Sequence, residues 1–132
     1  MTNNKSQITN NKTVVARASF VRFSPRKLRL VADSIRGQKP DKALEYLKLL
    51  PKRSALTLAH VFEQGIANAK NNFQVSPGDL FVESLQVEEG PRGPKKMDKS
   101  HGARFDRGIK RRRMAHIYLK LGVREEHSGT KS

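Results

Sequence analysis

Cationic side chains crowd into the segment "PRGPKKMDKSHGARFDRGIKRRR", residues 91 to 113. Ten of its 23 residues are Lys or Arg, two are Asp, and only Met97, Ala103, Phe105 and Ile109 are clearly apolar. Guanidinium and ammonium groups at this density suit the binding of phosphates, because each one is charged and donates hydrogen bonds. The segment itself buries too little apolar surface to offset the entropy lost on ordering. We therefore expect a polyanionic partner to give it its shape.

A second group of cations surrounds an expected helix start. Ser24 suits the N-cap position and Pro25 the first helical position, and Arg22, Arg26, Lys27 and Arg29 lie around them. Backbone N–H groups and the positive end of the helix dipole point toward such a site, so a phosphate would be stabilised there. The local pattern fits an ordinary Ser-Pro cap with exposed charges equally well, and both interpretations stay open.

Catalytic patterns are weak in this sequence. His60 and Glu63 are three residues apart, but no second His at metal-ligand spacing follows, and no phosphate-binding glycine motif is present. We expect His60 to be a partly exposed helix residue. Asp98 and Asp106 are expected to moderate the repulsion among their cationic neighbours, although two carboxylates could in principle bind magnesium as in a nuclease. The sequence predicts no enzyme, no metal and no cofactor.

The whole chain points to the same class of partner. Its 132 residues fit one domain, and 27 Lys and Arg against 12 Asp and Glu give a net charge of +15. No apolar run approaches the roughly 18 residues of a membrane span, and the N-terminus lacks the apolar core of a signal peptide. With no Cys, the chain suits the reducing cytoplasm. We expect no membrane partner and no homo-oligomer.

The elements that position the two cationic groups follow from hydrophobic periodicity. Residues 13–23 are rich in β-branched and aromatic side chains and predict a strand, and residues 117–123 alternate as a second clean strand. Between them we expect a helix from Ser24 to Gly37, a helix capped by Asp41 and ended by Pro51, a helix over about 52–71, and a strand from Leu80 with a bulge near Glu83 or Ser84.

The order β-α-α-α-β-β predicts an α+β fold, a small three-stranded antiparallel sheet packed on three helices. Residues 1–12 form an expected disordered tail, 13–124 a single globular RNA-binding domain, and 125–132 a polar tail. A long basic hairpin spanning 88–116 protrudes from the domain. Residues 90–120 carry +9 of the net charge, and arms of about ten residues would span on the order of 30 Å. The alternative is a disordered loop that only aids solubility.

Several motifs resemble one known family. The stretch "ARASFVRFSPRKLRLVADSIRGQKPDKALEYL" at 16–47, followed by "GIANAKNN", "VEEGP" and "AHIYLKL" in order, is similar to the universal L22 family of large-subunit ribosomal proteins, bacterial type. The resemblance covers about 14–123. It implies a structural constituent of the large subunit that binds ribosomal RNA, supports assembly and lines the nascent-peptide exit tunnel with its hairpin. Implied partners are ribosomal RNA, neighbouring ribosomal proteins and the nascent polypeptide.

The resemblance also implies which residues meet RNA. In the domain they are Arg22, Ser24, Arg26, Lys27, Asn68, Asn71 and Asn72; in the hairpin they are Arg92, Lys95, Lys96, Lys99, Arg104, Arg107, Lys110, Arg111, Arg112 and Arg113. This chain departs from the family pattern at the tip, which is a few residues longer. The expected tunnel-facing residues are Met97, Asp98, Lys99, Ser100, His101, Gly102, Ala103 and Arg104.

One alternative function comes from another class. A basic regulator that binds DNA or messenger RNA could use the two helices around Gly37 as a helix-turn-helix. Against it, the first helix carries its cations at its start, and the largest charge density lies in the hairpin and not on a recognition helix.

Overall fold

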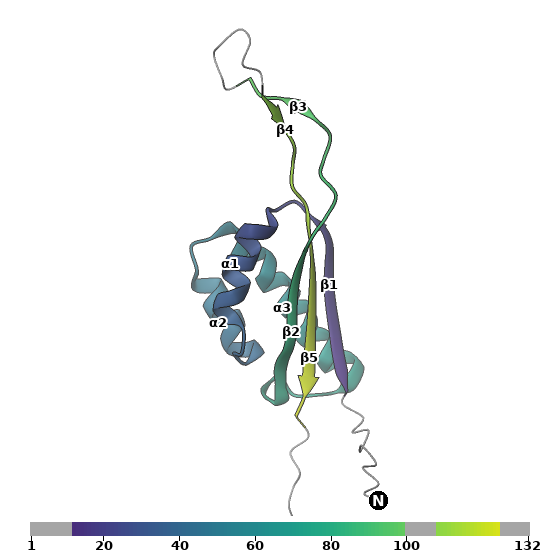
Figure 1. Ribbon diagram of the computed structural model, residues 1–132. Helices are drawn as coiled ribbons and strands as arrows, with labels where there is room; N and C mark the ends of the chain where they lie inside the picture. Colours follow the sequence, from purple (N-terminus) through teal and green to yellow (C-terminus); the bar gives the residue numbers. More distant parts are fainter. Residues whose placement is uncertain (1–11, 100–107, 125–132) are drawn as a thin grey trace, which may run out of the picture.

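The computed structural model describes residues 12–99 and 108–124 and confirms the α+β fold (Figure 1). Three helices cover one face of a three-stranded sheet, and a thin two-stranded hairpin extends beyond them (Figure 1). The elements are β1 (Thr13–Val21), α1 (Pro25–Ile35), α2 (Pro40–Leu49), α3 (Arg53–Phe73), a 3-10 turn (Pro77–Asp79), β2 (Leu80–Glu89), β3 (Lys96–Met97), β4 (Ile109–Lys110) and β5 (Ala115–Val123).

The last strand, β5, is the centre of the sheet. It pairs antiparallel with β1 on one side and with β2 on the other, giving the order β1-β5-β2. Its alternating residues Ala115, Ile117, Leu119 and Leu121 are all fully buried against the helices. The sequence predicted the antiparallel pairing of β2 with β5, and the structure confirms it. The pairing of β1 along the other edge of β5 completes the sheet.

A β-bulge in β2 keeps its apolar side chains on the buried face. Val82 pairs with Leu121 and Ser84 with Lys120, so Glu83 is the extra residue. Because side chains alternate across a strand, one inserted residue reverses the phase and turns Leu85 and Val87 inward. The predicted bulge is confirmed.

The helix starts differ in detail from the predictions. Ser24 does occupy the N-cap of α1, but its hydroxyl makes no capping hydrogen bond. The prediction that Asp41 caps α2 is wrong, because α2 begins one residue earlier at Pro40 and has Lys39 at its N-cap. Pro40 is well suited to a first helical position, since its ring fixes φ and no N–H is lost there. Asp41 lies in the first turn, where its charge favours the helix dipole.

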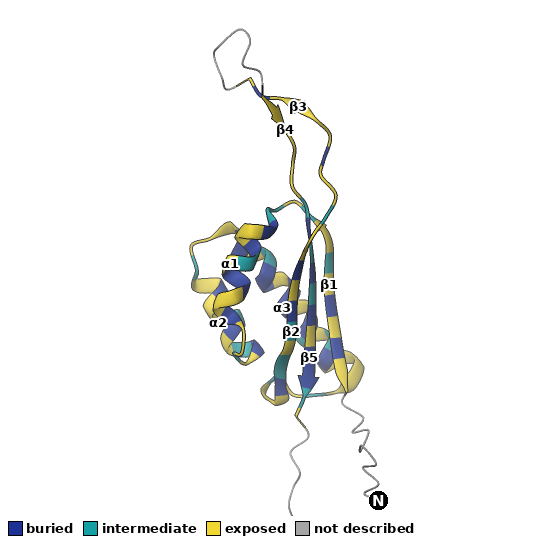
Figure 2. Ribbon diagram, in the orientation of Figure 1, coloured by how far each residue is buried: buried dark blue, intermediate teal, exposed yellow. Residues whose placement is uncertain are grey.

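The apolar stripes of the helices form one core with the sheet (Figure 2). On α3 this packing is closest at Gly65, which is buried against the strands. A carbon at its Cβ position would lie 3.1 Å from Leu121 Cδ1 and 3.2 Å from Leu119 Cδ2. The missing side chain therefore lets the helix approach the sheet more closely than another residue would allow.

The hairpin arms pair with each other beyond the domain (Figure 1). Lys96 is opposite Lys110 and Met97 opposite Ile109, and backbone hydrogen bonds of 2.7 to 2.8 Å join the arms from Gly90 to Asp98. Met97 and Ile109 remain largely exposed, so burial contributes little here. The arms are thus joined by backbone hydrogen bonds within the chain. That a partner fixes their shape remains a prediction.

Gly65→Val should overpack the contact between α3 and the sheet. The added Cβ already approaches Leu119 and Leu121 closely, and two methyl groups would add further volume. We therefore expect a loss of about 1–3 kcal/mol in the free energy of unfolding, measured by urea denaturation. Ala67→Val on the exposed side of α3 is the matched control and should cost less than about 0.7 kcal/mol. Equal stability of the two variants would show that the close approach is not required.

Candidate nucleic-acid interface

The structure joins the two cationic groups into one surface. Arg111, Arg112 and Arg113 at the foot of the hairpin line the same groove as residues around the start of α1. We call this the basic groove; its volume is about 490 Å³ and its lining residues are Arg22, Phe23, Ser24, Lys27, Arg53, Arg111, Arg112 and Arg113. Six of these eight residues are cations and none is acidic. Close like charges are unfavourable unless an anion lies between them.

Strand pairing explains why these residues meet. Val21 at the end of β1 pairs with Ala115 at the start of β5. Arg22 directly follows β1. Arg113 lies two residues before β5, with Met114 between them. Antiparallel pairing therefore brings the residues after β1 and before β5 to the same end of the sheet.

Two helix starts add backbone donors to the basic groove. Ser24 is the N-cap of α1 and Arg53 is the first residue of α3, and neither helix has an acidic residue in its first turn. Free N–H groups and the positive helix dipole at such ends favour anions. The basic groove thus combines mobile side-chain cations with fixed backbone donors, as phosphate binding requires.

Sequence reasoning missed Arg53. Its neighbourhood, "PKRSAL", is an ordinary helix start, and no local pattern connects it with Arg22, a cation 31 positions earlier. Only the packing of α3 beneath the end of β1 places it beside Arg22. A neighbouring hollow, lined by Val21, Arg22, Phe23, Arg53, Leu56, Thr57 and Arg112, continues the basic groove along α3.

A second groove of about 590 Å³ runs up the hairpin. It is lined by Arg22, Gly93, Pro94, Lys96, Lys110, Arg111, Arg112 and Met114. Arg22, Arg111 and Arg112 belong to both grooves, so the cationic surface is continuous from the domain to the arms. Lys95 and Lys99 are also exposed on the arm.

Arg26 and Arg92 occupy a more mixed site. They line a small hollow together with Arg113 and Glu89, and the carboxylate offsets part of the positive charge. We infer that Arg26 is a weaker anion contact than Lys27, its neighbour in the chain. The sequence alone did not distinguish the two.

Asn68, Asn71 and Asn72 lie at the opposite end of the domain. A helix of 21 residues is about 30 Å long, and these residues are in its last turns while Arg53 begins it. Asn68 is already engaged, since its Nδ2 donates a hydrogen bond to the carbonyl of Val15 at 3.3 Å. Asn71 and Asn72 are exposed. The predicted RNA residues therefore form two separate surfaces.

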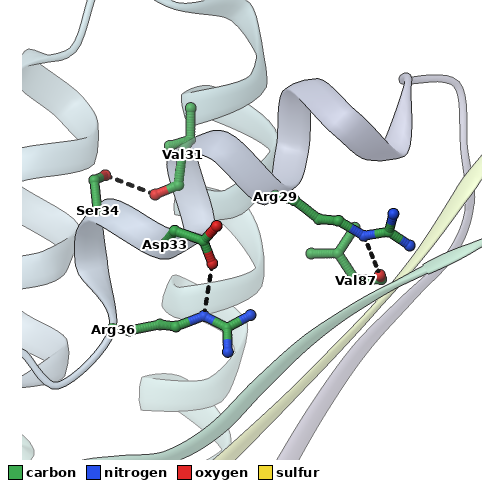
Figure 3. Close-up of polar contacts among 6 residues, drawn as sticks. All are labelled: Arg29, Val31, Asp33, Ser34, Arg36 and Val87. Atoms are coloured by element: carbon green, nitrogen blue, oxygen red, sulfur yellow. Dashed lines mark hydrogen bonds and ion pairs between the residues drawn. The ribbon is translucent and has the colours of Figure 1, made fainter.

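Arg29 belongs to the fold as well as to the charge cluster. Figure 3 shows its Nε donating a hydrogen bond to the carbonyl of Val87 on β2, at 3.1 Å. This bond ties α1 to an edge strand of the sheet, as Asn68 ties α3 to the other edge strand. On the same helix Arg36 pairs with Asp33 at 2.9 Å, away from the basic groove (Figure 3).

Asp98 is buried within the hairpin. Its carboxylate lies 2.8 Å from Lys110 Nζ, which fits the prediction that it moderates repulsion among the cations. Among residues 12–99 and 108–124 no three His, Asp or Glu side chains cluster as a metal site would need. Of the predicted tip, Met97, Asp98 and Lys99 are described; Ser100, His101, Gly102, Ala103 and Arg104, together with Arg107 and Asp106, lie outside the described residues.

The pair His60 and Glu63 forms a surface ion network and not a catalytic site. Glu63 lies 3.0 Å from Lys48 and 3.5 Å from His60, and the His60 side chain is more exposed than the partial exposure predicted. The hydrogen bond from Lys48, followed by its charge, lowers the pKa of the Glu63 carboxyl. A lowered pKa keeps Glu63 ionised at neutral pH and unsuited to act as a proton donor.

No helix in the described part of the chain is long and apolar enough to cross a membrane. A family model described as "Ribosomal protein L22p/L17e" matches residues 16–122, which include every residue that lines the basic groove. The chain belongs to this family.

Individual relatives agree with this assignment. The chain is 42% identical over 117 residues to the large ribosomal subunit protein uL22 of Petrotoga mobilis, covering 87% of this chain and 76% of the relative. It is 43% identical over 114 residues to the uL22 protein of Solibacter usitatus, covering 85% and 97%. A third relative, from Pelotomaculum thermopropionicum, is 38% identical over 109 residues, covering 83% and 94%.

Membership of the L22p/L17e family settles the class of protein. The chain is a structural constituent of the large ribosomal subunit, works in the ribosome during translation and is not an enzyme. This confirms the resemblance stated from the sequence. It also removes the reason for the magnesium-dependent nuclease hypothesis.

The crowded basic groove should make the free protein more stable as salt is added. Raising salt from about 20 to about 200 mM screens the repulsion between its cations. We expect the free energy of unfolding, measured by thermal denaturation, to rise by on the order of 1 kcal/mol. Arg53→Gln should reduce this gain, because it removes one cation from the basic groove. Arg36→Gln makes the same charge change at a residue already paired with Asp33 and should not reduce it. An identical salt response in the two variants would contradict the crowding.

Proposed function

We propose that this L22-family chain binds large-subunit ribosomal RNA through the basic groove and the hairpin, and that it supports subunit assembly in this way. The observation that carries the proposal is the convergence of six cations, with no acidic residue, at the foot of the hairpin. Phosphates spaced along an RNA backbone are the polyanion that such a surface fits. Neighbouring ribosomal proteins are further proposed partners, and the chain acts as a single copy.

The two parts of the surface contribute differently. The basic groove is held by β1, β5, α1 and α3, so its cations bind with a small ordering cost. The hairpin arms are long, exposed and weakly packed, so the entropy lost on ordering them offsets part of the binding free energy that they contribute. We infer that the basic groove anchors the chain and that the hairpin adds contacts once the domain has docked.

We propose that the hairpin lines the nascent-peptide exit tunnel, as the family resemblance implies. The arms extend away from the helices as a narrow two-stranded ribbon, a shape that fits between RNA segments (Figure 1). Met97 and Ile109 expose apolar side chains near its far end. They would face a passing polypeptide, while the lysines and arginines contact the RNA walls.

The alternative of a DNA- or mRNA-binding regulator has little support. The helix pair α1 and α2 would have to present cations along a recognition helix. On α1, Arg29 and Arg36 are engaged with Val87 and Asp33, and the cations nearest the basic groove lie at the helix start. No observation favours this function over ribosomal RNA.

Binding to deproteinised large-subunit RNA tests the basic groove. Affinity should fall on the order of a thousandfold between about 50 and 200 mM salt if at least six phosphates are contacted. Lys27→Gln and Arg53→Gln should each weaken binding and lower the slope of log affinity against log salt by about one. Arg36→Gln, paired with Asp33 away from the basic groove, is the control with the same change in net charge. If Arg36→Gln matches the other two, net charge and not the basic groove controls binding.

A unique cysteine can test the tunnel. The chain has no Cys, so Met97→Cys gives it a single thiol. Its reaction with a small maleimide in assembled large subunits can be followed on this chain after the subunit proteins are separated. We expect it to react in empty ribosomes and to react at least several-fold more slowly when a stalled nascent chain fills the tunnel. Leu49→Cys, on the exposed end of α2, is the control and should not change between the two states. Equal labelling of Met97→Cys in both states would reject tunnel lining.

A further inference from the structure

Phe20 has an unusual backbone conformation. Its φ is +56°, in the left-handed region, within a bulge of β1 where the register shifts between Ala18 and Val21. Bulky residues seldom adopt this conformation, because the Cβ approaches the following carbonyl. Such strain persists only where the surroundings enforce it, and it concentrates at functional sites.

His116 on the central strand holds this conformation. The backbone N–H of Phe20 donates a hydrogen bond to His116 Nδ1 at 3.1 Å. The two rings also meet edge to face, with centroids 4.9 Å apart and planes at 87°. His116 follows Ala115, a fully buried residue of β5, so the support comes from the central strand of the sheet.

Burial does not explain the strained Phe20. Its side chain is 61% exposed, although an ordinary strand residue could turn an aromatic ring toward the core. An edge contact uses at most one face of a ring, so a flat apolar face remains open to a partner. The strained backbone at Phe20 therefore holds this ring in an exposed position.

The neighbours of Phe20 indicate the partner. Arg22, two residues further along the chain, lines both cationic grooves together with Arg111 and Arg112. Arg17 lies three residues before Phe20 and is exposed. A single exposed ring beside clustered guanidinium groups fits a nucleotide, which has both an aromatic base and a phosphate. A protein surface would instead be expected to match a wider apolar patch.

We propose that Phe20 is a stacking platform for an unpaired base of ribosomal RNA whose neighbouring phosphates occupy the basic groove. The proposal rests on the function proposed above and adds a base contact to its phosphate contacts. His116 is a positioning residue that fixes the ring. Stacking uses the π face that every base has, so the contact tolerates different bases.

The full-length protein and deproteinised large-subunit RNA provide the test. Phe20→Leu should weaken binding by about 5- to 150-fold, the range for loss of one stacked base, and should leave the salt slope unchanged because no phosphate contact is lost. Phe20→Tyr should bind like the unmodified protein. Ultraviolet crosslinking followed by mass spectrometry should find the peptide containing Phe20 joined to a nucleotide, and Phe20→Leu should abolish that crosslink.

Two further variants separate binding from folding. Phe20→Gly removes the ring but suits the positive φ, so its melting temperature should not fall while its affinity falls as for Phe20→Leu. Phe73→Leu changes another exposed phenylalanine, at the far end of α3, and should leave both properties unchanged. This control excludes a general effect of losing an aromatic side chain.

The outcomes distinguish this proposal from the function on which it rests. If Lys27→Gln weakens binding but Phe20→Leu and Phe20→Gly do not, the basic groove binds RNA and the stacking proposal is wrong. If the Phe20 variants bind RNA normally but are excluded from subunits in competition with the unmodified protein, the ring contacts a neighbouring protein instead. A lowered salt slope in Phe20→Leu would also overturn it, since the ring would then act through phosphate contacts.

Discussion

The pairing of β5 with both β1 and β2 is the constraint on which the rest of the molecule depends. It buries the alternating residues Ala115 to Leu121 against the helices and fixes which end of the sheet receives the hairpin. The same pairing brings the arginines before β5 beside the residues that follow β1. A binding surface assembled from distant parts of the sequence therefore results from a single strand placement, and no flexible loop is needed to close it.

The cations of the basic groove oppose the folding of the free protein electrostatically. Six cations without an acidic neighbour repel one another, and two helix dipoles add positive potential. Some cations of the described residues do have an acidic partner, since Lys110 pairs with Asp98 and Lys48 with Glu63. The absence of an acidic residue from the lining of the basic groove is the reason why we propose that this surface binds an anionic partner, because an anion would offset the repulsion.

The sequence predicted the parts whose causes are local. Periodicity located all three helices, the alternating strand over 117–123, and a bulge near Glu83 or Ser84, because each depends on residues within a few positions. The N-cap of α2 was misplaced by two residues, since Pro40 was a stronger signal than Asp41. Arg53 and the Phe20–His116 contact could not be predicted, because tertiary packing alone brings these residues together. Motif resemblance, and not periodicity, indicated the ribosome.

The central position of the C-terminal strand has a consequence for how the protein is made. Thr13 at the start of β1 pairs with Gly122 near the end of β5, so the sheet cannot close until β5 has been synthesised. Until then β1 and β2 each lack their only neighbour in the three-stranded sheet, and their backbone groups are open to pairing with other chains. The arrival of β5 is thus the step that completes the three-stranded sheet.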